Sequence, residues 1–185
     1  MKKLTRFVAL TMVLCMMFST IAFAAEGETV ERPVTLDELN IDMEDVASMM
    51  ESASMQGSNS INAPAAPLTE FYVYAVYSED QPDGEIIQRS GSFYQTATML
   101  DHGGSWLVVV TLEVGYAGTR SATFKNSAMK LEEREPLDFD GDSIIDGYLC
   151  FWTYESDFTN GMFSASSKSI NSPWNTMQIN FFNIR

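Results

Sequence analysis

Four aspartates lie within nine positions of the 185-residue chain, in the run DFDGDSIID at residues 138–146. The first three, Asp138, Asp140 and Asp142, alternate strictly. Oxygen ligands at alternate positions let a short backbone wrap a hard cation, and carboxylates are ligands that Ca²⁺ prefers. Counted from Asp138, position seven offers the carbonyl of Ile144 and position nine is Asp146. The spacing therefore predicts a calcium site formed by these five residues.

This stretch resembles the calcium loops of EF-hands, dockerins and thrombospondin type 3 repeats. Ile145 stands at position eight, where such loops carry an apolar anchor. Two positions depart from the pattern: Ser143 replaces the glycine of the sharp turn, and Leu149 replaces the bidentate carboxylate of EF-hands. The flanking segments have strand composition, so we do not expect a helix–loop–helix. The resemblance implies a structural ion in a weak site, with a dissociation constant of about 10⁻⁴ to 10⁻³ M.

A solvated acidic turn between two strands is the alternative interpretation of the same residues. Without a counter-ion, each like-charge contact among the four aspartates costs up to about a kcal/mol near the surface. Glu132, Glu133 and Glu135 add to the same negative field. This repulsion favours a bound cation, and the sequence leaves both interpretations open.

Other residues that could do chemistry are few. Cys150 lies in the apolar run YLCFW, and we expect a buried, unreactive thiol there. His102 is the only histidine, and it follows Asp101 at a predicted hairpin tip. No serine lies in a nucleophile-elbow pattern, and no P-loop, dinucleotide fingerprint or zinc spacing appears. We therefore predict a protein without enzymatic activity and without catalytic residues.

Aromatic residues offer a second kind of site, a platform on which sugar rings could stack as in carbohydrate-binding sandwiches. The six candidates are Tyr72, Tyr74, Trp106, Trp152, Tyr154 and Trp174. Aromatic residues this frequent more often form the core and outer face of a sandwich. A carbohydrate-binding module is therefore only our third hypothesis for the function.

The elements that must position these residues are strands. From residue 67 onward, aromatic and β-branched runs alternate with turn chemistry, such as the stretch QPDGE at 81–85. In the run 105–116, Val108 and Val110 share one face while Leu107 and Val109 point to the other, as in a central strand covered on both sides. The run 119–134 reads as one further alternating strand. About seven to eight such strands, with no helical pattern between them, predict an antiparallel β-sandwich over residues 67–185.

The N-terminal 24 residues have the pattern of a bacterial secretory signal. A positively charged start precedes an apolar run at 7–18, and Ala22 and Ala24 supply the small residues that a signal peptidase requires. The apolar run is shorter than the ~20 residues of a bilayer span. We predict cleavage after Ala24, a secreted protein, and no membrane span in the mature chain.

Residues 25–66 contain nine acidic residues, one arginine and no aromatic residue. From Thr35, which with Glu38 has capping-box spacing, we predict a short acidic helix. Its apolar stripe consists of Leu39, Met43, Val46 and Met50. An uncharged Ser/Asn/Ala/Pro linker follows. The helix could dock on the domain, serve as a pro-segment, or bind a partner; its composition predicts a domain that folds without it.

The charge balance disfavours some classes of binding partner. The whole chain has a formal charge of −14, and loss of the signal removes three of 11 basic residues and none of 25 acidic ones, leaving −17. Such a field repels phosphate backbones and anionic lipid, so nucleic acid and membrane surfaces are disfavoured. The leading hypothesis is a secreted, non-enzymatic β-sandwich that binds an extracellular protein or glycan. A bacteriocin-like or toxin-like secreted factor is the alternative.

Overall fold

The computed structural model describes residues 41, 46, 66–90, 93–138 and 141–185 of the chain. Val46 lies in a helix, and the remaining regular structure of these residues consists of strands. The strands are β1 (Glu70–Ser78), β2 (Gln81–Ile86), β3 (Arg89–Ser90), β4 (Phe93–Tyr94), β5 (Leu107–Val114), β6 (Ala117–Phe124), β7 (Ser127–Ala128), β8 (Lys130–Leu137), β9 (Gly147–Tyr154), β10 (Gly161–Ser169) and β11 (Thr176–Ile184).

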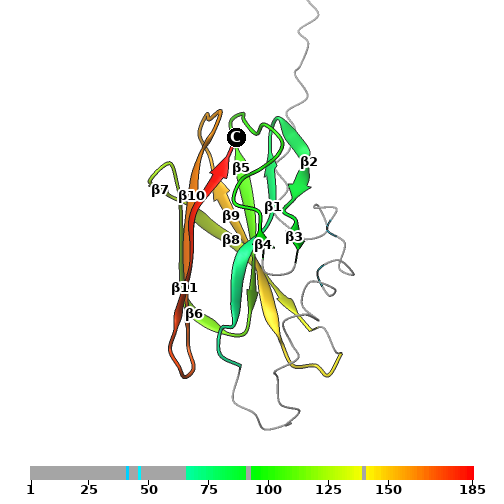
Figure 1. Ribbon diagram of the computed structural model, residues 1–185, viewed down its shortest axis with the longest axis vertical. Coiled ribbons are helices and arrows are strands. Elements are labelled where there is room, and N and C mark those ends of the chain that lie inside the picture. The colour runs from blue at the N-terminus through cyan, green and yellow to red at the C-terminus, as the bar shows by residue number, and fades with distance from the viewer. Residues whose placement is uncertain (1–40, 42–45, 47–65, 91–92, 139–140) are drawn as a thin grey trace, which may run out of the picture. The chain divides into compact units, whose positions relative to one another are not determined.

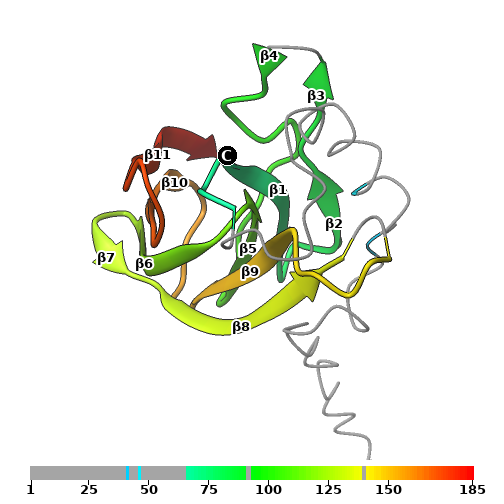
Figure 2. The ribbon, with the colours of Figure 1, turned by 90° about the horizontal axis from the view of Figure 1, so that it is seen from below.

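Nine of these strands form two antiparallel sheets, which Figure 1 and Figure 2 show as two layers. One sheet has five strands in the order β2-β1-β5-β9-β8, and the other has four in the order β11-β10-β6-β7. The short strands β3 and β4 pair with each other. The predicted fold class, an antiparallel β-sandwich, is confirmed. Among the described residues, no helix is both long enough and apolar enough to cross a membrane.

The core between the sheets uses alternate residues of the facing strands. Val109 on β5 and Trp152 on β9 meet Phe124 on β6, Phe163 on β10 and Phe182 on β11. Each of these five side chains is at most 4% exposed. Because successive side chains of a strand point to opposite faces, the intervening residues of the same strands point away from this core.

The five-stranded sheet is buried on its second face as well. All residues of β5 are buried, as expected of a central strand covered on both sides. We call its second surface the outer apolar face. It is formed by Tyr72, Tyr74, Val108, Val110, Leu112, Leu149 and Phe151. Val46 and Ile41 pack into the same cluster from outside the sheet, and Val46 is fully buried.

The predicted N-terminal helix is described at two positions only. Val46 is helical, as its place in the apolar stripe requires, whereas Ile41 is not. A helix running unbroken from Thr35 through Ile41 is therefore wrong at that residue, where Asn40 and a β-branched side chain both have low helix propensity. The predicted signal peptide, most of the predicted linker and the stripe residues Leu39, Met43 and Met50 lie outside the described residues.

One predicted strand and one predicted turn differ from the observed structure. The run 119–134 is not one strand, because Lys125 and Asn126, with φ of 51° and 64°, form a two-residue turn between β6 and β7. Positive φ at both central residues matches the twist of a tight hairpin. The chain then crosses to the five-stranded sheet as β8.

The turn predicted over residues 81–85 is also displaced. Ser78 pairs with Gln81, so the turn residues are Glu79 and Asp80, and β2 begins at Gln81. Gly84 lies within β2 at a φ of 76°, and a Cβ there would overlap the Tyr77 ring. The glycine therefore allows a close approach between strands rather than a turn.

Candidate functional site

The predicted calcium loop is ordered by its own aspartates. The Asp138 carboxylate accepts backbone N–H groups from Gly141, at 2.8 Å, and from Ser143, at 2.9 Å. The Asp142 carboxylate accepts the N–H of Ile144 at 2.7 Å. Ser143 has a φ of 68°, so it adopts the left-handed conformation for which calcium loops use glycine at position six. The aspartates thus stabilise the sharp turn through backbone hydrogen bonds.

Neighbouring strands hold the end of this loop. The backbone N–H of Asp146 donates to the Leu137 carbonyl at 2.7 Å, and the Gly115 N–H donates to the Asp146 carbonyl at the same distance. No group of three or more metal-ligating side chains is found among the described residues, and Asp140, the second predicted ligand, lies outside them. Calcium binding at Asp138, Asp140, Asp142, Ile144 and Asp146 therefore stays a prediction.

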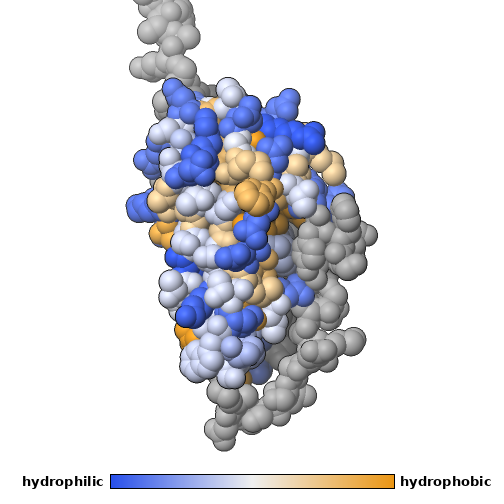
Figure 3. All heavy atoms as spheres, turned by 60° about the vertical axis from the view of Figure 1, so that its left-hand side comes forward, coloured by the Kyte–Doolittle hydropathy of each residue, from blue (hydrophilic) through white to orange (hydrophobic). Residues whose placement is uncertain are grey.

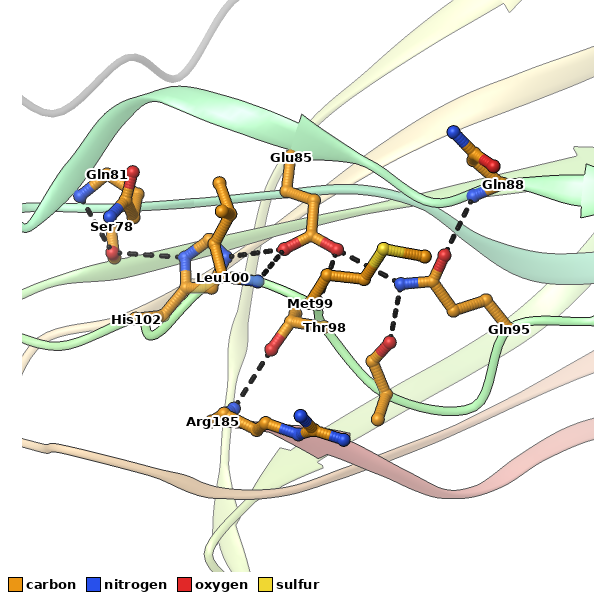
Figure 4. A network of polar contacts seen from close by, with 11 residues as sticks. Ser78, Gln81, Glu85, Gln88, Gln95, Thr98, Met99, Leu100, His102 and Arg185 are labelled. Atoms are coloured by element: carbon orange, nitrogen blue, oxygen red, sulfur yellow. Dashed lines mark hydrogen bonds and ion pairs between the residues drawn. The ribbon is translucent and has the colours of Figure 1, made fainter.

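His102 is buried at 2% exposure, so the predicted hairpin tip is wrong. Figure 4 shows its imidazole between Ser78 and Glu85, with Nδ1 at 3.1 Å from the Ser78 hydroxyl and Nε2 at 3.4 Å from the Glu85 carboxylate. The Ser78 oxygen also accepts the N–H of Gln81 at 3.2 Å. With the Nε2 proton directed to Glu85, Nδ1 accepts the Ser78 hydroxyl proton, and every group in this line has a partner.

A serine, a histidine and a carboxylate in one hydrogen-bonded line is also the inventory of a nucleophilic active site. Here Ser78 is fully buried, so a substrate carbonyl has no approach to its oxygen. The Glu85 carboxylate is further held by the backbone N–H groups of Met99, at 2.7 Å, and Leu100, at 2.8 Å. Burial lowers the pKa of His102, and the nearby Glu85 only partly opposes this. The arrangement supports a structural role.

That role is to close one side of the sandwich. The segment 96–102 is fixed to β2 through Glu85 and to the edge of β11 through backbone bonds, including Thr98 N–H to the Asn183 carbonyl at 2.9 Å. Edge strands present unpaired backbone groups to other chains, and covering them prevents edge-to-edge association. The Ser78–His102–Glu85 network therefore positions a segment that bridges both sheets.

Cys150 is a free, fully buried thiol, as expected. Burial raises its pKa to about 12, and the neighbouring Glu113 carboxylate adds to the shift. A thiol with such a pKa is protonated at neutral pH and is a poor nucleophile. The structure places Cys150 in the core rather than in a reactive site.

Most of the six aromatic residues considered as a sugar platform are buried. Tyr72, Tyr74 and Trp106 belong to the buried outer apolar cluster, and Trp152 is in the core between the sheets. Tyr154 is half-buried, and Trp174 alone is exposed, at 62%. These residues do not form one exposed platform, because alternation along the strands divides them between the two buried faces.

A second surface that could bind a ligand is the outer face of the four-stranded sheet, which we call the hydroxyl face. Side chains of β6, β10 and β11 that point away from the core line up in three rows across these strands. The rows are Thr123 with Ser164, then Ser121, Ser166 and Gln178, then Thr119, Lys168 and Thr176. The hydroxyls of Ser121 and Ser166 lie 3.0 Å apart. Figure 3 turns this side forward and shows pale residues of intermediate hydropathy, with apolar ones among them.

Exposed aromatic residues flank the hydroxyl face. Phe181 is 71% exposed near the carboxyl end of β11, and Trp174 lies in the β10–β11 hairpin. Both have positive φ, 61° for Phe181 and 59° for Trp174. At Phe181 the register of β10 and β11 shifts, and its N–H donates to the Ser164 hydroxyl at 3.4 Å. This bulge turns Phe181 outward while Phe182 keeps its place in the core.

Residues 63–184 match the family described as "Domain of unknown function (DUF4879)". The chain belongs to this family. The DUF4879 domain contains all the described strands, and Ile41 and Val46 precede it. No curated protein and no solved structure matches the chain significantly.

The hydroxyl face of the DUF4879 domain was missed by the sequence-based prediction, although its residues carry a signal. Outward positions of β6 and β10 are mostly Ser or Thr, with Lys168 and Met162 among them, and they alternate with inward residues such as Ala122, Phe163 and Ala165. The neighbouring phenylalanines Phe181 and Phe182 cannot both enter the core of a regular strand. A bulge that exposes one of them is the expected solution.

Proposed function

We propose that this chain is a secreted, non-enzymatic binding protein whose DUF4879 domain binds an uncharged glycan on the hydroxyl face. The observation that carries the proposal is Phe181, which is 71% exposed beside rows of hydroxyl and amide side chains. The secretory signal pattern at residues 1–24 supports an extracellular setting in which glycans are abundant.

The chemistry of the hydroxyl face suits a sugar. Hydroxyl and amide groups both donate and accept hydrogen bonds, as sugar hydroxyls do, so many relative orientations can be satisfied. Ser121, Ser166 and Gln178 present such groups in one row across the sheet. The C–H face of a pyranose is apolar and can stack on an aromatic ring, a contact that Phe181 offers at one end of the rows.

The conformation of Phe181 supports a binding role. A bulky residue at a φ of 61° is uncommon and costs backbone energy, and its ring, which is largely exposed, buries little surface that would offset this cost. Strained backbone of this kind concentrates at functional sites. Trp174 shares the same combination of positive φ and exposure.

Charge and composition favour a neutral glycan over other ligands. Lys168 is the single charged residue in the three rows, whereas the mature chain as a whole has a formal charge of −17 and repels anionic polymers. Serine is depleted at protein–protein interfaces relative to the rest of the surface, and this face is rich in it. An extended, hydroxyl-rich polymer fits a flat face of this kind better than a protein does.

We also propose that the loop at residues 138–146 binds one calcium ion with a structural role. The support is the left-handed turn at Ser143 and the carboxylates of Asp138 and Asp142, which accept hydrogen bonds from the adjacent backbone N–H groups of Ser143 and Ile144. The loop joins β8 to β9 in the five-stranded sheet, so an ion there would stabilise the sandwich without touching the hydroxyl face.

A co-sedimentation screen tests the glycan proposal. The mature protein is incubated with insoluble cellulose, chitin, xylan, mannan and peptidoglycan, and the bound fraction is measured. We expect retention on at least one neutral polysaccharide, loss of retention in Phe181→Ala, and no loss in Ile144→Ala. Ile144 is a matched control because its side chain is apolar, 44% exposed and outside the four-stranded sheet, and Ala keeps the backbone carbonyl that the proposed calcium site uses. Absence of binding to every polymer, or equal binding by Phe181→Ala, contradicts the proposal.

A further inference from the structure

A two-layer sandwich does not require the outer apolar face of the five-stranded sheet to be buried. In such folds each sheet buries one face against the other sheet, and antiparallel sheets commonly leave the second face solvated. Here Tyr74, Val108, Val110, Leu149 and Phe151 all lie on that second face and are fully buried. A cover must therefore lie over them.

The described residues identify where that cover comes from. The cluster on this face includes Val46, which is helical and 0% exposed, and Ile41 packs against it. Both residues precede the DUF4879 domain, which begins at residue 63. All other members of the cluster belong to the described part of the domain itself and lie between residues 72 and 151. The contribution from outside the domain is therefore the segment that carries Ile41 and Val46.

We propose that the outer apolar face is a docking site for the acidic segment around Ile41 and Val46, which binds it as a non-covalent ligand within the same chain. The partner chemistry is that of an acidic amphipathic peptide with β-branched apolar anchors. The only cysteine outside the N-terminal apolar run, Cys150, is a free thiol in the core, so no disulfide holds the segment in place.

The linker sequence makes such a docked segment separable. Residues 52–67 are small and polar with two prolines and no charge, a composition that provides reach without its own core. If the segment leaves, aromatic and aliphatic side chains from three neighbouring strands, β1, β5 and β9, become exposed together. Contiguous apolar patches of this kind are rare on soluble monomers and associate with other surfaces.

The experiment uses the full mature chain with a site-specific protease sequence placed at residues 57–60. After cleavage under native conditions, size-exclusion chromatography reports whether the N-terminal fragment stays bound. We expect both fragments to co-elute, and a fluorescent peptide of residues 31–56 to exchange into the nicked complex. Separate elution of the fragments, with an unchanged melting temperature of the residue 61–185 fragment, overturns the proposal.

Substitution of Val46 gives the second readout. We expect Val46→Asp to release the fragment after cleavage and to lower the melting temperature of the uncut protein by roughly 10 °C, since it places a charge in an apolar site. If Val46→Asp does not fold, Val46→Ala should still fold and weaken peptide binding at least fivefold. Met162→Asp is the matched control, because Met162 is 41% exposed on the other sheet and should change neither measurement. Equal behaviour of the Val46 variants and the wild type overturns the proposal.

Discussion

Glu113 and Arg120 form an ion pair between the two sheets, with the Glu113 carboxylate 2.8 Å from the Arg120 Nε. Their side chains are 0% and 7% exposed, and the Ser167 hydroxyl donates to the second carboxylate oxygen at 2.6 Å. Glu113 comes from β5 and Arg120 from β6, so the pair links the central strand of one sheet to the facing sheet.

Breaking this pair should destabilise the fold strongly. Removal of one partner leaves a buried charge without compensation, which typically costs about 3–5 kcal/mol, so Glu113→Ala should lower the free energy of unfolding by that amount. Urea denaturation measures it. Lys130→Ala, which removes the ion pair between the exposed Lys130 and Glu132, is the control and should change little. Equal effects of the two substitutions would contradict the structural role of Glu113.

The buried His102 should make the folding stability of the protein depend on pH. Burial lowers its pKa below the ordinary value of 6.5, so the unfolded chain takes up a proton at higher pH than the folded chain does. Stability from the neutral imidazole is therefore complete above about pH 6.5 and declines as the pH falls toward the lowered value. Melting curves from pH 7.5 to 5 should show this decline, and His102→Gln should flatten it. The same slope in His102→Gln would assign the effect to the carboxylates.

Calcium should stabilise the protein through the loop at residues 138–146. With a dissociation constant of about 10⁻⁴ to 10⁻³ M, 10 mM Ca²⁺ contributes about 1.4 to 2.7 kcal/mol, or a rise in melting temperature of roughly 3–10 °C. Asp140→Ala should abolish the rise, whereas Asp83→Ala, an exposed aspartate on β2, should keep it. Identical melting curves in calcium and in chelator would show that the loop is an acidic turn.

Trp174 should report directly on ligand binding. Of the three tryptophans, Trp106 and Trp152 are 7% and 2% exposed, while Trp174 is 62% exposed. Acrylamide should therefore quench mainly the Trp174 emission, and an oligosaccharide bound across the hydroxyl face should protect it. Trp174→Phe should remove most of the quenchable signal. Unchanged quenching at saturating ligand would place the ligand elsewhere.

Local sequence pattern accounts for the strands but not for the contacts that join them. The alternation of Val108 and Val110 with Leu107 and Val109 predicted a doubly covered central strand, and β5 is one. Extending the same alternation puts Glu113 on the inward side, but its partner Arg120 becomes evident only once β6 is known to face β5.

Other features depend on long-range contacts or local strain that no short motif encodes. His102 contacts Ser78 and Glu85, residues 24 and 17 positions away, so nothing adjacent to it in the chain indicates its burial. The turn at Lys125 and Asn126 lacks the glycine that usually marks such turns. A calcium site at residues 138–146, in contrast, could be predicted from local spacing, because its ligands would all come from one short run.

The most direct test of the account is the affinity of the mature protein for the neutral polysaccharide retained in the screen, measured by isothermal titration with its soluble oligosaccharides. A sugar ring stacked on Phe181 should make Phe181→Ala bind at least tenfold more weakly, while Ile144→Ala binds like the wild type and both variants keep the wild-type melting temperature. A Phe181→Ala affinity equal to that of the wild type would contradict the assignment of the hydroxyl face as the binding site.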